Sequence, residues 1–236
     1  MNTNDEKEPK KKKSKRKLLY WLCADLLFAI ALVVLLLYKP AGYNPVIPTV
    51  DSNEPQEVHG YLTHLSSEVY NGIQTKKPFD LEIVEEGINQ AISQAKWPME
   101  SEGIIFAAPK ASFTTEGISL IGTATVEGIN LAITIEGQPT LSEQGQLNLH
   151  IKAIRIGAMN ITLVAKMIAK HMYNEKFAWV FTDSTDVRGH IATSFLEDKP
   201  FDPVFDYDDK YIRLTGMTLE KGRTRLTLVP VPRPRP

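Results

Sequence analysis

Residues 118–156 read ISLIGTATVEGINLAITIEGQPTLSEQGQLNLHIKAIRI, and this stretch indicates the type of fold. Within it, apolar and polar residues alternate over three runs: Ile118–Val126, Asn130–Glu136 and Gln146–Lys152. Alternation with a period of two places every second side chain on the same face of a β-strand. Glu127-Gly128 and Ser142–Gly145 supply turn-forming residues between the runs. The stretch therefore predicts three antiparallel strands joined by short turns.

The alternation shifts by one position at Ala153. Ile154 and Ile156 continue the apolar series out of step with Leu149 and Ile151. A one-residue shift inside a strand is typical of a β-bulge, where one strand carries an extra residue. We expect a bulge or a bend at this point of the third strand.

The flanking sequence carries both helical and strand-like patterns. Apolar residues recur every three or four positions in Val58–Ile73, Val84–Ala95 and Leu163–Met172, which predicts three helices. Further strands are predicted at Phe79–Ile83, Asp186–Phe195, Tyr211–Leu219 and Arg223–Val229. Because neighbouring strands are joined by turns and not by crossover helices, we predict one α+β domain. In it, a curved antiparallel sheet packs on two or three helices.

One apolar run, Leu18–Tyr38, precedes this domain and reads LLYWLCADLLFAIALVVLLLY. As a helix it would be about 31 Å long, which matches a bilayer core of about 30 Å. Tyr20, Trp21 and Tyr38 stand near its ends, where aromatic rings favour the headgroup level. A cleaved signal peptide would have a shorter apolar region and a site of small residues. We therefore predict an uncleaved signal anchor, that is, a transmembrane helix.

A basic cluster directly precedes the apolar run: Lys10, Lys11, Lys12, Lys13, Lys15, Arg16 and Lys17. By the positive-inside rule, the N-terminus stays in the cytoplasm and the rest of the chain is extracytoplasmic, in a single-pass protein of the cell membrane. Met1–Lys17 has eight Lys and Arg against three acids (+5), whereas Lys39–Pro236 has nineteen against twenty-four (−5). This acidic field argues against a nucleic-acid partner.

Asp25 is the single charged residue of the run, about 10 Å from its basic end by helical rise. One interpretation is a hydrated acid near the headgroups, paired with the basic tail. The other is a contact to a second membrane helix or an ion path. The sequence leaves both open.

Composition divides the chain into five parts. They are a basic cytoplasmic tail (1–17), the transmembrane helix (18–38), a Pro-rich linker (39–57), the extracytoplasmic α+β domain (58–229) and a Pro/Arg tail (230–236). Proline lacks the N–H that a sheet ladder needs, so we expect the last part to leave the sheet.

The order of elements resembles that of YpmS-like membrane-anchored envelope proteins. The resemblance rests on a helix pair, a meander of long strands, and the run Ile154–Ile161, with its Ile-Gly pair, leading into a helix at Thr162. It covers most of Phe79–Val231, although that family usually has proline where Thr162 stands. It implies an envelope location, a curved sheet around helices like that of tubular lipid-binding domains, and an apolar ligand.

The residue types of catalytic and metal sites lack the required spacing. No two of His59, His64, His150, His171 and His190 are four apart on a helix, and Cys23 is the single cysteine, which excludes a Cys-based zinc site. The acidic pairs Asp183/Asp186 and Asp206/Asp208, followed by Asp209, lack the glycine and distant glutamate of a calcium loop, so we interpret them as turn residues. Nucleophile and phosphate-loop motifs are absent. We expect no cofactor.

Two functions remain as predictions. The first is a non-catalytic envelope protein whose outer domain binds an apolar ligand such as lipid, or scaffolds other envelope or membrane proteins. The alternative is an envelope hydrolase with a dispersed site, in which several of His150, His190, Asp183, Asp186 and Asp208 converge in one cleft.

Overall fold

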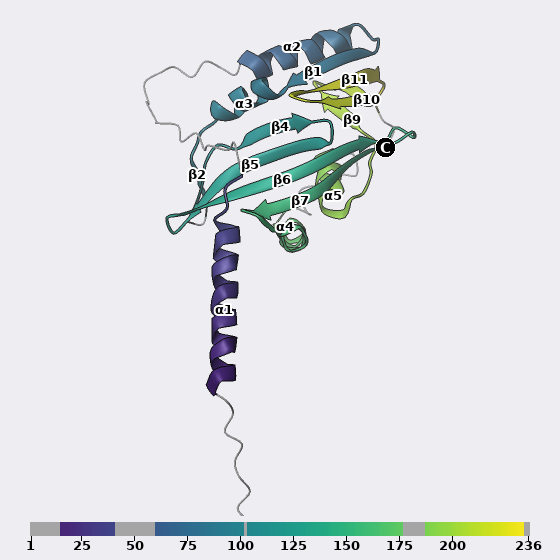
Figure 1. The fold of residues 1–236 in the computed structure, drawn as a ribbon. Coiled ribbons are helices and arrows are strands. Elements are labelled where there is room, and N and C mark those ends of the chain that lie inside the picture. Colours follow the sequence, from purple (N-terminus) through teal and green to yellow (C-terminus); the bar gives the residue numbers. More distant parts are fainter. Residues whose placement is uncertain (1–14, 41–59, 102, 177–186, 234–236) are drawn as a thin grey trace, which may run out of the picture.

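The structure is a computed structural model that describes residues 15–40, 60–101, 103–176 and 187–233 (Figure 1). It confirms the α+β class, with antiparallel strands and five helices among the described residues. The helices are α1 (Lys15–Leu36), α2 (Gly60–Gln74), α3 (Glu85–Ser93), α4 (Thr162–Lys176) and α5 (Val187–Glu197). Most of the predicted basic tail and linker lies outside the described residues.

The strands form two open sheets. The smaller has the order β1-β11-β10-β9, made of β1 (Phe79–Val84), β11 (Arg223–Val231), β10 (Lys210–Glu220) and β9 (Val204–Tyr207). The larger has the order β2-β3-β5-β6-β7-β8, with β4 also paired to β5. Its strands are β2 (Met99–Ser101), β3 (Ile104–Phe106), β4 (Lys110–Thr114), β5 (Gly117–Val126), β6 (Ile129–Leu141), β7 (Leu147–Ile156) and β8 (Met159–Asn160).

The predicted meander is confirmed as β5, β6 and β7. The turn from β5 to β6 has positive φ at Glu127 (50°) and Gly128 (81°), the backbone of a tight two-residue hairpin. The predicted bulge is also confirmed, because Glu136 pairs with Ala153 and Gly137 pairs with Ile151. Lys152 is the extra residue, so Ile154 and Ile156 lie on the same face of β7 as Leu149 and Ile151.

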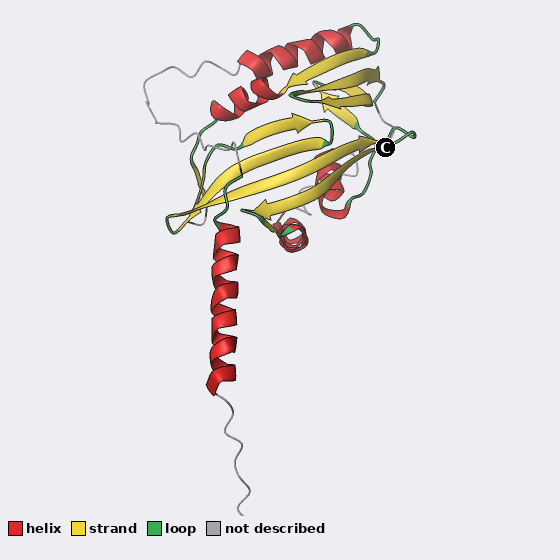
Figure 2. Cartoon of the chain, viewed as in Figure 1, coloured by secondary structure: helices red, strands yellow, loops and turns green. Residues whose placement is uncertain are grey.

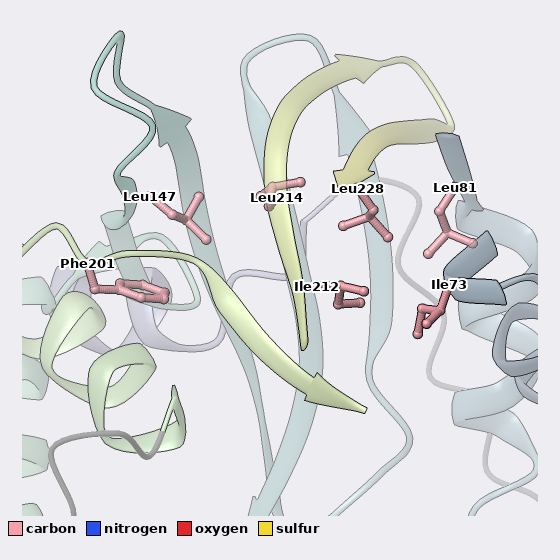
Figure 3. Packing of buried hydrophobic residues seen from close by; sticks show 7 residues of the cluster. All are labelled: Ile73, Leu81, Leu147, Phe201, Ile212, Leu214 and Leu228. Atoms are coloured by element: carbon pink, nitrogen blue, oxygen red, sulfur yellow. The ribbon is translucent and has the colours of Figure 1, made fainter. Parts of the chain in front are cut away.

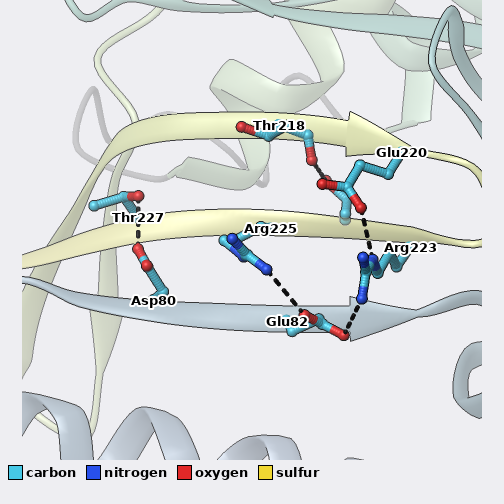
Figure 4. Close-up of polar contacts among 8 residues, drawn as sticks. Asp80, Glu82, Thr218, Glu220, Arg223, Arg225 and Thr227 are labelled. Carbon is cyan, nitrogen blue, oxygen red and sulfur yellow. Dashed lines mark hydrogen bonds and ion pairs between the residues drawn. The ribbon is translucent and has the colours of Figure 1, made fainter.

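The smaller sheet has one polar and one apolar face. On the polar face, Glu82 of β1 accepts from Arg223 and Arg225 of β11, each at 3.5 Å, and Thr227 donates to Asp80 at 2.7 Å (Figure 4). Glu220 of β10 accepts from Arg223 at 2.7 Å, and its carboxylate raises the pKa of that guanidinium. The residues between these positions are Leu81, Leu226 and the buried Thr224, and they face the larger sheet.

The buried core lies between the apolar face of the smaller sheet and one end of the larger one. Its buried members come from α2, β1, β7, β10, β11 and the segment before β9: Ile73, Leu81, Leu147, Phe201, Ile212, Leu214 and Leu228 (Figure 3). Two sheets thus share one apolar interior, whose burial is the main favourable term of folding.

A closed ring of three hydrogen bonds joins the two sheets. The N–H of Glu85 donates to the carbonyl of Gly222 (2.8 Å), and the N–H of Gly222 donates to the carbonyl of Phe113 (3.0 Å). The N–H of Phe113 donates to Oε2 of Glu85 (2.7 Å). One helical turn further, the side-chain amide of Asn89 exchanges two hydrogen bonds with the backbone of Ala111, at 2.7 and 2.9 Å. Side chains of α3 thereby satisfy the open edge of β4.

The predicted strand at Asp186–Phe195 is wrong, because Val187–Glu197 forms helix α5 (Figure 2). Val187 and Ile191 also share a helical face, and both pack against the core cluster. Ser194 is fully buried, and its Oγ accepts from the N–H of Leu149 at 2.8 Å. A side chain therefore occupies the edge of β7 that a further strand would have used.

Two other regions extend the sheets beyond the prediction. β11 continues through Pro230 and Val231, two residues into the predicted Pro/Arg tail, opposite Ile212 and Tyr211. Its pairing with β1 ends at Leu228, so proline stands where β11 has become an edge strand on that side. The short strands β2, β3, β4 and β9 have no counterpart in the predicted set.

α1 is long and apolar enough to span a membrane, and none of its window Leu19–Leu36 is buried against protein. Its last turn contacts the turn between β7 and β8. The N–H of Ala158 donates to the carbonyl of Leu35 at 2.8 Å. A Cβ on Gly157, which has φ +59°, would stand 2.3 Å from the same oxygen, so the contact requires glycine there.

We expect Glu85→Ala to destabilise the domain by about 1–3 kcal/mol, because it leaves the buried N–H of Phe113 without an acceptor. The free energy of unfolding from chemical denaturation measures this. Glu86→Ala, at the exposed neighbouring position, is the matched control and should change it little. Glu85→Gln should lose less than Glu85→Ala, and equal losses for Glu85→Ala and Glu86→Ala would contradict the role of the ring.

Candidate functional site

The two sheets border an apolar pocket of about 550 Å³. The smaller sheet contributes inward side chains of all four of its strands, and the larger contributes β5, β6 and β7. The main apolar lining residues are Leu81, Ile83, Ile118, Ile135, Leu147, Leu149, Phe205, Ile212, Leu214, Met217, Leu226 and Leu228. Val69 of α2 and Phe195 of α5 complete the wall.

A bulge in β10 shapes this wall. Leu214 pairs with Leu228 and Met217 pairs with Leu226, whereas Thr215 is the extra residue between them. The Oγ1 of Thr215 donates to the carbonyl of Thr227 at 3.2 Å. The shift brings Met217 to the pocket side instead of Gly216, and a methionine side chain adapts readily to irregular apolar spaces.

A second pocket, of about 340 Å³, adjoins the first on the same face of the larger sheet. Ile135 lines both pockets. It pairs with Leu120 of the second pocket, while Ile118 pairs with Gly137 in the first. Trp97, Met99 and Phe106 form the far wall of the second pocket. The two pockets therefore form one apolar strip along β5 and β6.

The electrostatic character of the strip is nearly neutral. Among the described residues that line the two pockets, Asp206 alone is a charged residue, and it is exposed. No three His, Cys, Asp or Glu residues of the described part are grouped so that they could hold a metal ion. The arrangement suits burial of an apolar chain.

The histidines have separate surroundings. His150 bonds through Nδ1 to Asp198 at 2.7 Å, and His190 stacks on Phe201 with ring centroids 6.0 Å apart. His64 and His171 lie near Glu68 (3.8 Å) and Glu175 (3.3 Å), one turn along their own helices. His59 is outside the described residues.

The two acidic pairs also lie apart from each other in the chain, and only one of them is in the described residues. Asp208 and Asp209 form the β9–β10 turn with positive φ of 52° and 59°, as predicted for turn residues, whereas Asp206 lies within strand β9 and pairs with Tyr211. Asp183 and Asp186 lie outside the described residues. Three residues of the hydrolase alternative are described. His150 makes a hydrogen bond with Asp198, His190 stacks on Phe201, and Asp208 forms a turn.

Three of the four predicted span residues fall on α1. Leu18, Trp21 and Asp25 lie within it, and Tyr38 follows two residues after its end. Trp21, Asp25 and Tyr38 are exposed. Lys15, Arg16 and Lys17 form its first turn, whereas Lys10, Lys11, Lys12 and Lys13 are outside the described residues.

Ion pairs fasten α4 to the end of α5. Hydrogen bonds from Lys170 and then Lys199 lower the pKa of the Glu197 carboxyl to about 2. Burial of Asp198 raises the pKa of its carboxyl, but the hydrogen bonds from Lys166 and His150 outweigh that effect and leave the pKa below its usual value. Both carboxylates therefore stay charged well into acidic conditions.

No protein-family model matches this chain, and no curated protein matches it. The function of the site is therefore inferred from its geometry alone. The sequence indicated the apolar faces of β5, β6 and β7 but not Trp97, Phe205 or Met217. The sequence of β10 does contain a signal for Met217. Its apolar residues stand at positions 212 and 214 and then, after Gly216, at 217 and 219, so the alternation shifts by one residue.

We expect Ile118→Phe to cost less than about 1 kcal/mol, because the larger ring can enter the pocket. Ala111→Leu should cost about 1–3 kcal/mol, because Ala111 is 3% exposed and packed by α3. Melting temperature and denaturant unfolding measure both. A larger loss for Ile118→Phe than for Ala111→Leu would contradict an open pocket.

We expect the domain to lose stability as the pH falls from about 4.5 toward about 2, where Glu197 takes up its proton. A carboxyl whose pKa is lowered by folding contributes stability above its unfolded pKa and loses it on acidification through its folded pKa. Denaturant unfolding at several pH values measures this. Glu197→Gln removes the group, so its stability should fall less over the same window, and parallel curves would contradict the prediction.

Proposed function

We propose that this chain is a non-catalytic, single-pass, membrane-anchored envelope protein whose extracytoplasmic domain binds the acyl chain of a lipid. The observation that carries the proposal is the apolar pocket of about 550 Å³ between the two sheets. Its volume falls within the range of about 300–1,000 Å³ that is typical of small-ligand sites.

The physical reason is that an apolar space of this size is unfavourable when nothing apolar fills it. Lining side chains such as Leu149 and Met217 forgo dispersion contacts across the gap. Water inside would find few hydrogen-bond partners, because the wall is almost wholly apolar. A flexible hydrocarbon chain restores the contacts and removes its own apolar surface from water.

The anchor supports the proposal by supplying the ligand source. α1 has the length and composition of a membrane span, and the basic cluster before it favours a cytoplasmic N-terminus. The acidic domain then stands outside, close to a lipid surface. The proposal includes the predicted curvature of the larger sheet and its packing on helices, which would enclose the chain.

The resemblance to YpmS-like envelope proteins stays a prediction and agrees with this proposal in location and ligand class. The scaffold version of the function names other envelope or membrane proteins as partners. The apolar strip along β5 and β6 favours the lipid version, because its two pockets adjoin and their walls are almost wholly apolar.

The proposal is tested with the full chain in vesicles that contain a phospholipid carrying a photoreactive diazirine in one acyl chain. We expect crosslinks to peptides of β5, β7 and β10. Gly137→Trp should reduce them several-fold, because Gly137 borders the pocket and its Cβ position meets only ordinary contacts at 3.9 Å.

Thr140→Trp is the matched control, since it adds the same side chain at an exposed position of the same strand. It should leave the crosslinks in place. Crosslinks confined to α1, or equal loss in both variants with unchanged melting temperature, would overturn the lipid-binding function while leaving the membrane anchor standing.

A further inference from the structure

Helix α4 turns its apolar side away from the rest of the domain. Its exposed apolar residues follow helical spacing on one face: Leu163, Val164, Met167, Ile168 and Met172. Leu163 is 85% exposed and Met167 is 66% exposed. His171 interrupts this face and lies toward its C-terminal end. In a water-facing helix, the apolar stripe is expected on the opposite side, against the core.

The other side of α4 is held by polar contacts. Lys166, with 17% of its side chain exposed, reaches Asp198 at 2.9 Å, and Lys170 reaches Glu197 at 2.7 Å. At the start of the helix, Oγ1 of Thr162 accepts from the N–H of Ile154 at 2.8 Å. These contacts fix the rotation of α4 about its axis, so its apolar face cannot turn inward without breaking them.

The end of α1 lies beside the start of α4. The Ala158 N–H bonds to the carbonyl of Leu35 in the last turn of α1, and α4 begins at Thr162, shortly after this β7–β8 turn. Figure 1 looks nearly along the axis of α4, whereas it shows α1 from the side, so the two axes cross steeply. A helix that crosses a span at its exit point lies along the surface that the span leaves.

The length of α1 sets the depth of this contact. Its 22 residues extend about 33 Å, so nearly the whole helix is needed to cross a bilayer core of about 30 Å. Leu35 therefore stands near the boundary of the core, and the β7–β8 turn and the first turn of α4 stand at the same level.

We propose that α4 is an interfacial helix that lies in the headgroup region of the leaflet from which α1 emerges, with its five exposed apolar side chains inserted among the acyl chains. The inference rests on the membrane span of the proposed function. Lipid is the occupant of this face because the Leu35–Ala158 contact holds the face beside the membrane exit. Lysines on the opposite side and a bulky apolar face are the composition of such helices.

The test uses the full chain in vesicles of phosphatidylethanolamine and phosphatidylglycerol, with some lipids carrying a nitroxide high in the acyl chain. In a Cys23→Ser background, Met167→Cys is labelled with a fluorophore. We expect the nitroxide to quench it several-fold more than the same label at Thr140→Cys, an exposed position of β6. Aqueous iodide should show the reverse order, and both single substitutions replace exposed side chains.

The native Cys23, labelled in the unchanged chain, reports on α1 separately. Quenching at Cys23 without quenching at Met167→Cys would overturn this inference and leave the anchor intact. Quenching at neither position would overturn the anchor as well. A label at Met167→Cys that is shielded from both iodide and nitroxide would show that protein covers the face, and this would overturn the proposal. If chemical crosslinking then gives a dimer, the covering protein is a second copy of the chain. If the protein stays a monomer, another segment of the same chain covers the face.

Discussion

The hydrogen-bond ring of Glu85, Phe113 and Gly222 is the constraint on which the rest of the domain depends. It joins the start of α3, directly after β1, and the β10–β11 turn of the smaller sheet to the open edge of β4 in the larger sheet. The positive φ of Gly222 (79°) lets its N–H reach Phe113 while its carbonyl accepts from Glu85. The ring fixes the two sheets at this corner, and the pocket lies between their apolar faces.

The sequence predicts most of the elements because their signals are local. Strands β5, β6 and β7 alternate strictly, and the extra residue at Lys152 appears as a phase shift in the sequence itself. Helix α5 is predicted as a strand because the apolar residues Val187, Ile191 and Phe195 are four positions apart. This spacing fits both the period of two of a strand and the turn of a helix. The choice between them depends on Ser194, whose partner at Leu149 is far away in the chain. Strands of three to five residues such as β2 and β4 are too short to show a period at all.

The site is harder to predict from the sequence than the fold, because it is a cavity between apolar side chains and has no characteristic residue types. Each lining leucine has the pattern of an ordinary core position, and only the placement of two sheets shows that the core is hollow between Leu149 and Met217. The direction of α4 is hidden for a similar reason. Its spacing identifies one apolar face, but whether that face points inward depends on acids contributed by a different helix.

The bond between Ala158 and Leu35 has a consequence for the order of assembly. It links α1 to a turn that is made more than half the chain later, so it can form only after β7 and β8 have paired. Contacts between such distant segments form late, because the chain between them must first be ordered. Formation of helix α1 and folding of the domain are then separate events. The docking of one on the other is the final step, and it depends on a single glycine at position 157 that leaves room for the approach.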